Sequence, residues 1–367
     1  MTVDAPTNEP PPGKIPGTPE VPEDAGRAAV PGREGETPIV ALDGVAKRFV
    51  KRLDIAARLA NALGAKQREQ IVHAVDHVDM AVMPGEVVGL VGESGCGKST
   101  LGRMVAGIHQ PTEGRVLFRG RDVAAMKGEE AKDAQLKIQM IFKDPLSSLN
   151  PRLRVGEIIG EAPRVHGLVP RGESRDRVAA AMQRVGLDPA YARRYPHQFS
   201  GGQRQRIGIA RALAVEPDFL VCDEAVAALD VSIQAQVLNL FMRLRDELDL
   251  TYLFISHDLG VVEHLSDRVL IMYLGRIVEA APTAELFAAP NHPYTQALLA
   301  EVPRLDTTRR IYTPIKGEIP SPLDPPPGCH FHPRCPHAHE RCRVEVPALK
   351  EIAPGRLSAC HLNDLAA

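Results

Sequence analysis

One segment of the sequence has the composition of a phosphate-binding loop, or P-loop. Residues 92–100 read GESGCGKST and match the pattern G-x-x-x-x-G-K-[ST]. Glycines let such a loop curl until several backbone N–H groups point at phosphate oxygens, and the helix that follows adds its positive N-terminal end. Lys98 would reach the β- and γ-phosphates, and the Ser99 hydroxyl would ligate Mg²⁺. The residues predicted to contact the nucleotide are Gly92, Ser94, Gly95, Cys96, Gly97, Lys98, Ser99 and Thr100.

Two neighbouring carboxylates follow a short apolar run. Residues 219–224 read FLVCDE, which is the pattern of a buried strand that ends in Asp223 and Glu224. Asp223 would hold Mg²⁺ beside the P-loop, and Glu224 would orient or deprotonate an attacking water. Such a run is weak evidence by itself, since many strands end this way. In a chain that also carries a P-loop, it points to hydrolysis of a nucleoside triphosphate.

A second glycine-rich segment precedes a predicted helix. Residues 200–206 read SGGQRQR. Ser200 is a suitable N-cap, and Gly201 and Gly202, just before Gln203, leave backbone N–H groups open to an anion. An ordinary capped helix after a flexible turn explains the same residues. The segment therefore counts as a second anion site only in combination with the P-loop.

These residues need a scaffold, and the sequence predicts an α/β sheet with helical cover, because short apolar strands alternate with helical patterns. The predicted strands span residues 39–45, 75–83, 86–91, 138–142, 219–222, 252–255 and 269–272. The predicted helices span residues 175–185, 203–214, 233–248 and 259–265. Residues 50–73 have a helical pattern and are expected to be an insertion between two strands.

The composition is that of an ordinary globular protein. The chain has 367 residues and a formal net charge of −2, which argues against a general nucleic-acid binder. It shows no apolar run long enough for a membrane span and no apolar N-terminal segment typical of a signal peptide. We therefore expect a cytosolic protein. Residues 1–38 contain nine prolines and are predicted to be a disordered tail.

The three motifs, in this order, resemble those of ATP-binding cassette (ABC) ATPases, over about residues 39–300. The resemblance implies a RecA-like core sheet with an antiparallel β subdomain and a helical subdomain, and ATP with Mg²⁺ at the site. It implies that Phe49 stacks on adenine and that His257 is a switch histidine contacting the γ-phosphate. Ser200, Gly201, Gly202 and Gln203 match the signature that contacts ATP bound to a second subunit, and Asp230 matches the loop that crosses this dimer interface.

Further segments are similar to ATPase subunits of oligopeptide, dipeptide and nickel importers. They include residues 140–151 (MIFKDPLSSLNP), 195–199 (YPHQF), 229–236 (LDVSIQAQ) and 291–295 (NHPYT), and residues 199–213 look like the subunit usually named with the suffix F. This resemblance implies two transmembrane permease subunits, a second homologous ATPase subunit and, indirectly, an extracytoplasmic solute-binding protein. It implies a peripheral position on the cytoplasmic face of the inner membrane. The solute stays open between peptides, nickel and other compounds.

The sequence departs from this family at Lys143, where the family has a glutamine that ligates Mg²⁺. An ammonium group has no lone pair for a metal, so Lys143 would instead touch a phosphate or an acidic neighbour. Ala225 and Ala227 also replace the expected Pro and Ser after Glu224. We expect the site on this subunit's own P-loop to bind ATP but hydrolyse it slowly, while the signature serves the partner's site. A non-catalytic regulatory module is the alternative.

Four cysteines gather in the C-terminal segment. Cys329, Cys335, Cys342 and Cys360 have the spacing C-x5-C-x6-C-x17-C, without the tight knuckles typical of zinc sites. Four thiolates with long loops suit a [4Fe–4S] cluster, which some members of the importer family carry; zinc and free or disulfide-bonded thiols are the alternatives. Nearby histidines offer further ligands: His330, His332, His337, His339 and His361. Cys96 and Cys222 are interpreted as packing residues.

The expected organisation is a tail at 1–38, an ABC nucleotide-binding domain at 39–285 with its helical subdomain at about 144–215, and a Cys-rich extension at 286–367. A soluble ABC ATPase that acts on DNA or ribosomes is a rival interpretation. Such proteins usually carry coiled-coil insertions or two cassettes, and neither is visible in the sequence.

Overall fold

The computed structural model describes residues 36–51, 61, 69–170, 172–301 and 317–364. The predicted disordered tail falls outside these ranges except for its last three residues. The predicted helix within residues 50–73 also falls outside them, apart from Asn61 and the two flanking strand ends.

The strands, in chain order, are β1 (Val40–Lys51), β2 (Gln70–Val82), β3 (Val87–Val91), β4 (Glu113–Phe118), β5 (Arg121–Asp122), β6 (Ile138–Ile141), β7 (Phe219–Asp223), β8 (Thr251–Ser256), β9 (Arg268–Tyr273), β10 (Arg276–Pro282), β11 (Lys350–Ala353) and β12 (Arg356–Ser358). The helices are α2 (Lys98–Val105), α3 (Gly128–Lys137), α4 (Val155–Val165), α5 (Ser174–Arg184), α6 (Gly201–Leu213), α7 (Val231–Leu248), α8 (Leu259–Leu265), α9 (Thr283–Ala288), α10 (Pro293–Ala300) and α11 (Glu340–Val344). Short 3₁₀ turns are η1 (Pro189–Arg193), η2 (Pro196–Gln198), η3 (His332–Arg334) and η4 (His361–Asp364).

The main sheet positions the catalytic candidates. Within the described ranges its strand order is β11-β12-β10-β9-β3-β8-β7-β6, and β6, β7, β8, β3 and β9 run parallel. Every residue of β3, β7, β8 and β9 is buried. Helices α6 to α9 cover one face of this part of the sheet, and α2 together with β1, β2 and β4 covers the other. The P-loop follows β3 and Glu224 follows β7, so the parallel arrangement brings both to the carboxyl edge of the sheet.

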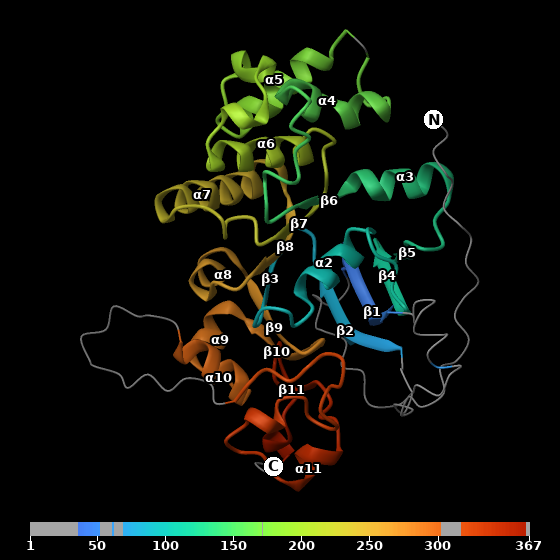
Figure 1. Ribbon diagram of the computed structural model, residues 1–367, viewed down its shortest axis with the longest axis vertical. Coiled ribbons are helices and arrows are strands. Elements are labelled where there is room, and N and C mark those ends of the chain that lie inside the picture. Colours follow the sequence, from blue (N-terminus) through green and yellow to red (C-terminus); the bar gives the residue numbers. More distant parts are fainter. Residues whose placement is uncertain (1–35, 52–60, 62–68, 171, 302–316, 365–367) are drawn as a thin grey trace.

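A smaller antiparallel sheet, of order β2-β1-β4-β5 in the described residues, lies beside the main one (Figure 1). Its strand β1 continues to Lys51, well beyond the predicted end at residue 45. The second half of β1 pairs with the start of β2, from Lys47 opposite Val75 to Lys51 opposite Gln70. This half is partly exposed and lacks the apolar pattern of a buried strand, which explains why the sequence prediction stopped too early.

Two parts of the chain lie at opposite ends of the molecule. Figure 1 shows α4, α5 and α6 at one end of the long axis and the C-terminal segment at the other. The α4–α6 group shares one apolar core with α7 and with β7 and β8. At the other end β12 pairs with β10, so the C-terminal segment extends the main sheet itself. The predicted mixed α/β architecture, with antiparallel and helical parts around a parallel core, is confirmed.

Candidate active site

The P-loop connects β3 to α2 and is tightly packed. Gly97 has a φ of +111°, and a Cβ atom there would lie 2.1 Å from the carbonyl oxygen of Ala74. Only glycine meets both conditions, since other residues avoid this φ and the space is filled by backbone. The Lys98 ammonium is buried and donates to the carbonyls of Gly92 (2.7 Å) and Glu93 (2.9 Å).

Ser99 and Asp223 form the oxygen-rich corner of the site. The Ser99 hydroxyl donates to Asp223 Oδ1 at 2.7 Å, which joins the start of α2 to the end of β7. Burial raises the pKa of Asp223, although this hydrogen bond acts in the opposite direction. Two adjacent hard oxygen donors fit Mg²⁺, which prefers carboxylate and hydroxyl ligands together with substrate phosphates.

Glu224 sits one residue beyond β7 in a strained conformation. Its φ is +48°, a region that side-chain-bearing residues seldom occupy outside turns and functional sites. Its N–H donates to the carbonyl of Ile255 on β8, which fixes the backbone and turns the carboxylate toward the edge of the sheet. Strain held in place by sheet hydrogen bonds is typical of a residue whose side chain must point at a substrate.

Two cationic or titratable groups contact that carboxylate. Lys143 Nζ lies 2.6 Å from Glu224 Oε2, and His257 Nδ1 lies 3.2 Å from the same oxygen. Burial alone would raise the pKa of Glu224, but the Lys143 hydrogen bond and the charges of Lys143, His257 and Lys98 hold it below its ordinary value. The hydrogen bond to Glu224 raises the pKa of Lys143, which keeps that group a cation. The sequence analysis expected Lys143 to contact a phosphate or an acidic neighbour, and in the structure it contacts the acidic residue Glu224.

The structure thus brings together Lys98, Ser99, Lys143, Asp223, Glu224 and His257. Phe49 lies apart on β1, with 39% of its surface exposed, and its ring meets His109 edge-on at 5.7 Å between centroids. An exposed ring of this kind can stack on a nucleotide base.

The segment from Ser200 to Gln203 belongs to a different surface. The Ser200 hydroxyl accepts from the Gln203 N–H at 3.4 Å, and Gln203 Oε1 accepts from the Ser200 N–H at 3.1 Å, which is a capping box at the start of α6. A Cβ on Gly202 would lie 2.4 Å from Ile233, so this segment packs against the start of α7 just after Asp230. Among the described residues, no hydrogen bond or ion pair joins the segment to the P-loop of the same chain.

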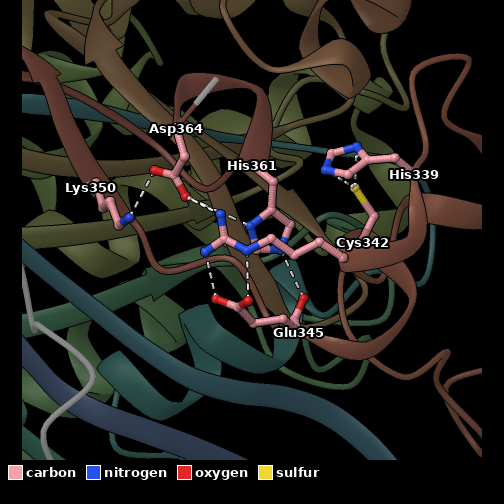
Figure 2. A network of polar contacts seen from close by, with 7 residues as sticks. His339, Cys342, Glu345, Lys350, His361 and Asp364 are labelled. Carbon is pink, nitrogen blue, oxygen red and sulfur yellow. Dashed lines mark hydrogen bonds and ion pairs between the residues drawn. The ribbon is translucent and has the colours of Figure 1, made fainter. Parts of the chain in front are cut away.

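The C-terminal cysteines are free thiols that influence one another. Burial, with a smaller contribution from the charges of Cys335, Cys342 and Cys360, raises the pKa of Cys329 to about 11. Cys342 Sγ also lies 3.3 Å from His339 Nδ1, in the polar network of Figure 2. In the part of the chain that is described, no group of three or more Cys, His, Asp or Glu is arranged to hold a metal ion. The predicted metal site therefore gains no support from this geometry.

Sequence reasoning also missed two residues that touch the P-loop from the C-terminal side. The Tyr294 hydroxyl accepts from the Glu93 N–H at 2.9 Å, and Arg334 forms an ion pair with the Glu93 carboxylate. The NHPYT segment was noted for its resemblance alone, and nothing in the local pattern around Arg334 signals a contact with a residue 241 positions earlier.

A P-loop lysine, a strand-end Asp-Glu pair and a histidine after the next strand define a P-loop ATPase. The family described as "ABC transporter" matches residues 75–227, and that described as "Oligopeptide/dipeptide transporter, C-terminal region" matches residues 278–342. The chain belongs to the ATP-binding proteins of the ABC transporter family. As such it is an ATPase that works with permease subunits and is membrane-associated. Within the described ranges, no helix is both long and apolar enough to cross a bilayer.

Two curated relatives illustrate the similarity. The probable peptide ABC transporter ATP-binding protein y4tS of Sinorhizobium fredii is 51% identical over 303 residues, which are 82% of this chain and 86% of the relative. The oligopeptide transport ATP-binding protein AppF of Bacillus subtilis is 52% identical over 295 residues, 79% of this chain and 90% of the relative.

Solved structures agree on the fold. Both cbiO1 of Clostridium perfringens, part of the ABC transporter complex cbiONQ, and the dimeric cassette MJ0796 in a post-hydrolysis state with ADP and Pi have TM-scores of 0.56 at 27% identity. The first match covers 69% of this chain and 92% of cbiO1, and the second covers 66% of this chain and 98% of MJ0796.

Proposed function

We propose that this ATPase energises the import of oligopeptides or dipeptides. The observation that carries the proposal is the presence, in one chain, of the ABC segment and of the C-terminal region described for oligopeptide/dipeptide transporters. The printed name of AppF supports the same substrate class. The subunit would lie peripherally on the cytoplasmic face of the inner membrane. Its domains would be the nucleotide-binding domain at 39–285, with a helical subdomain at about 144–215, and the extension at 286–367.

The chemistry is phosphoryl transfer to water. Lys98 would turn from the Gly92 and Glu93 carbonyls to the β- and γ-phosphates, and Glu224 would orient the attacking water while His257 contacts the γ-phosphate. Mg²⁺, held by Ser99 and Asp223, would neutralise charge that develops on the phosphates.

The working unit in this proposal is a head-to-tail pair with a second, homologous ATPase subunit. The residues at the start of α6 and α7 face outward: Gly201 is exposed, and Val231, next to Asp230, is 84% exposed. They are open to a second subunit's ATP, and MJ0796 is a dimeric cassette. Closure over two ATPs would rearrange two permease subunits, which receive solute from an extracytoplasmic binding protein.

Transport assays test the substrate class. The chain is reconstituted in proteoliposomes with its permeases and partner ATPase, and ATP-dependent uptake of labelled tri- to hexapeptides, dipeptides and nickel is compared. Uptake of peptides that is lost in Lys98→Ala supports the proposal. Uptake of nickel but not of peptides would show that the transported solute is nickel, and the proposed ATPase function would still hold.

We further propose that Lys143 restrains hydrolysis at this subunit's own P-loop. A carboxylate with a lowered pKa is a weaker base, and an ammonium 2.6 Å away occupies the oxygen that would accept a proton from water. The alternative of a non-catalytic regulatory subunit rests on the same contact. If Glu224→Gln abolishes residual turnover at the own site, that site is slow but catalytic; if it changes nothing, the regulatory alternative holds.

For the extension we propose a [4Fe–4S] cluster on Cys329, Cys335, Cys342 and Cys360, with zinc as the alternative. The support is the closeness of four soft thiols: besides burial, the charges of neighbouring cysteines raise the pKa of Cys329, Cys335 and Cys360. Thiolates are ligands that suit iron and sulfide. Iron, zinc and acid-labile sulfide content of protein purified without oxygen tests it. Protein free of all three would leave the thiols without a metal role.

A further inference from the structure

The second residue of the P-loop, Glu93, is held from three directions. Its N–H donates to the Tyr294 hydroxyl at 2.9 Å, and its carbonyl accepts from Lys98 Nζ at 2.9 Å. Its carboxylate accepts two hydrogen bonds from Arg334, at 2.6 and 2.9 Å. The contacts with Tyr294 and Arg334 come from outside the P-loop. The C-terminal part of the chain therefore anchors the entrance of the P-loop.

Arg334 is suited to hold a carboxylate in one orientation. Its planar guanidinium binds Glu93 with two parallel hydrogen bonds, which fixes direction as well as distance. The Arg334 side chain is only 4% exposed, and it also lies 3.4 Å from the Tyr273 hydroxyl. An exposed surface pair would contribute little, but a buried bidentate pair is strongly directional.

An aromatic cluster keeps Arg334 in place. The rings of Tyr273, Tyr294 and Phe331 pack at centroid distances of 4.7 to 5.3 Å. Phe331 precedes Arg334 by three residues, at the edge of the turn η3, and Cys329 and Cys335 pack against the same cluster. The position of the guanidinium is thus set by the folded extension.

This anchor matters for ATP in two ways. Lys98 must leave the Gly92 and Glu93 carbonyls to reach the phosphates, and the loop keeps its shape only if something else holds Glu93. In addition, a bare carboxylate in a phosphate-binding loop would repel a triphosphate, and the guanidinium of Arg334 neutralises it.

We infer that Arg334 is a positioning residue of the nucleotide site: through Glu93 it aligns the P-loop and cancels the Glu93 charge, so the Cys-rich extension takes part in ATP binding. The inference rests on ATP binding at this P-loop. Arg334 itself is not a catalytic residue, because it acts on the nucleotide only through Glu93.

The test measures the Kd of ATP, by displacement of a fluorescent ATP analogue, and the Tm of the full-length chain. We expect Arg334→Gln to weaken ATP binding roughly fivefold or more. The double variant Glu93→Gln/Arg334→Gln should bind ATP more tightly than Arg334→Gln, because the unpaired carboxylate is gone, yet less tightly than wild type. Arg334→Lys keeps the charge without the two-point contact and should be intermediate.

Arg341→Gln is the matched control. Arg341 belongs to the same extension and pairs with Glu345 (2.6 Å) and Asp364 (2.7 Å), two carboxylates labelled in Figure 2 that are not part of the P-loop. Its loss should lower the Tm and leave the Kd of ATP unchanged.

Wild-type ATP affinity in Arg334→Gln, with a lowered Tm, would make Arg334 a structural strut and overturn the inference. If Arg334→Gln does not fold, the Kd of ATP is measured for Glu93→Gln/Arg334→Gln instead. Wild-type ATP affinity in this double variant would also overturn the inference. A wild-type chain that fails to bind ATP would instead overturn the ATPase function itself.

Discussion

Lys143 Nζ lies 2.6 Å from Glu224 Oε2, so the residue in place of the expected glutamine is ion-paired with the candidate catalytic base. His257 approaches the same carboxylate oxygen, at 3.2 Å. Before the base can accept a proton from water, both contacts must loosen or share the oxygen. This links the departure from the family pattern to a specific effect on catalysis.

The first prediction concerns the pH dependence of hydrolysis. Lys143 contributes to the lowered pKa of Glu224, so Lys143→Gln should let that pKa rise. A base with a higher pKa loses its proton-accepting form at a higher pH, so the acidic limb of the rate profile should shift upward in pH. Single-turnover rates between pH 4.5 and 8 measure this shift. Superimposable acidic limbs would mean that Lys143 does not influence the base.

The second prediction concerns the capping serine of α6. Ser200→Ala should lower the turnover of the partner's site about 100-fold if its hydroxyl contacts the transferred phosphate. Loss of the cap should cost about 1 kcal/mol of stability. Asp188→Ala is the control, because Asp188 caps η1 and its loss should reduce stability without affecting turnover. Equal turnover in the two variants would argue against a role of Ser200 at the partner's ATP.

The third prediction compares two glycines with positive φ. Gly97→Ala should destabilise the chain by about 3 kcal/mol or more, since the new Cβ would meet the Ala74 carbonyl in addition to the strained φ. Gly85 has a smaller positive φ of +72° and no atom within 4 Å of an added Cβ, so Gly85→Ala should cost about 1–2 kcal/mol. Urea unfolding measures both. Similar losses of unfolding free energy in the two variants would show that the backbone at Ala74 shifts readily to make room for the new Cβ.

The fourth prediction concerns stability in acid. Burial lowers the pKa of His292 to about 4, and its Nδ1 accepts from the Tyr294 N–H at 3.0 Å. The unfolded chain takes up this proton near pH 6.5 and the folded chain only near pH 4. The contribution of His292 to the free energy of unfolding is therefore fully present above about pH 6.5. It falls by up to about 3 kcal/mol as the pH drops toward 4.

His292→Asn preserves an acceptor for the Tyr294 N–H and should flatten that dependence. The slope should not vanish, because burial lowers the pKa of His330 to about 4 as well. Urea unfolding between pH 7 and 4 measures the difference. Parallel curves for wild type and variant would mean that His292 binds its proton equally well in the folded and the unfolded chain.

Motifs with local geometry could be predicted from the sequence. The P-loop, the Asp-Glu strand end and the N-cap at Ser200 each depend on neighbouring residues, and the buried strands β3, β7, β8 and β9 show as apolar runs. Their placement at one edge follows from parallel pairing.

Contacts between distant segments could not be predicted. The pairing of β12 with β10 and the Arg334–Glu93 ion pair join residues that no periodicity relates. Similarly, the sequence shows that residue 143 is a lysine and therefore not a metal ligand. Only the folded chain shows that its ammonium group contacts Glu224. A single sequence specifies such contacts through the whole packing, which local patterns do not reveal.

The most direct measurement is ATP turnover at this subunit's own P-loop, in the assembled transporter whose other catalytic glutamate is replaced by glutamine. We predict slow turnover for wild type, a rise of about tenfold or more for Lys143→Gln, and no rise for Lys143→Arg, which keeps a cation on Glu224. Fast turnover in the wild type, unchanged by Lys143→Gln, would contradict the account.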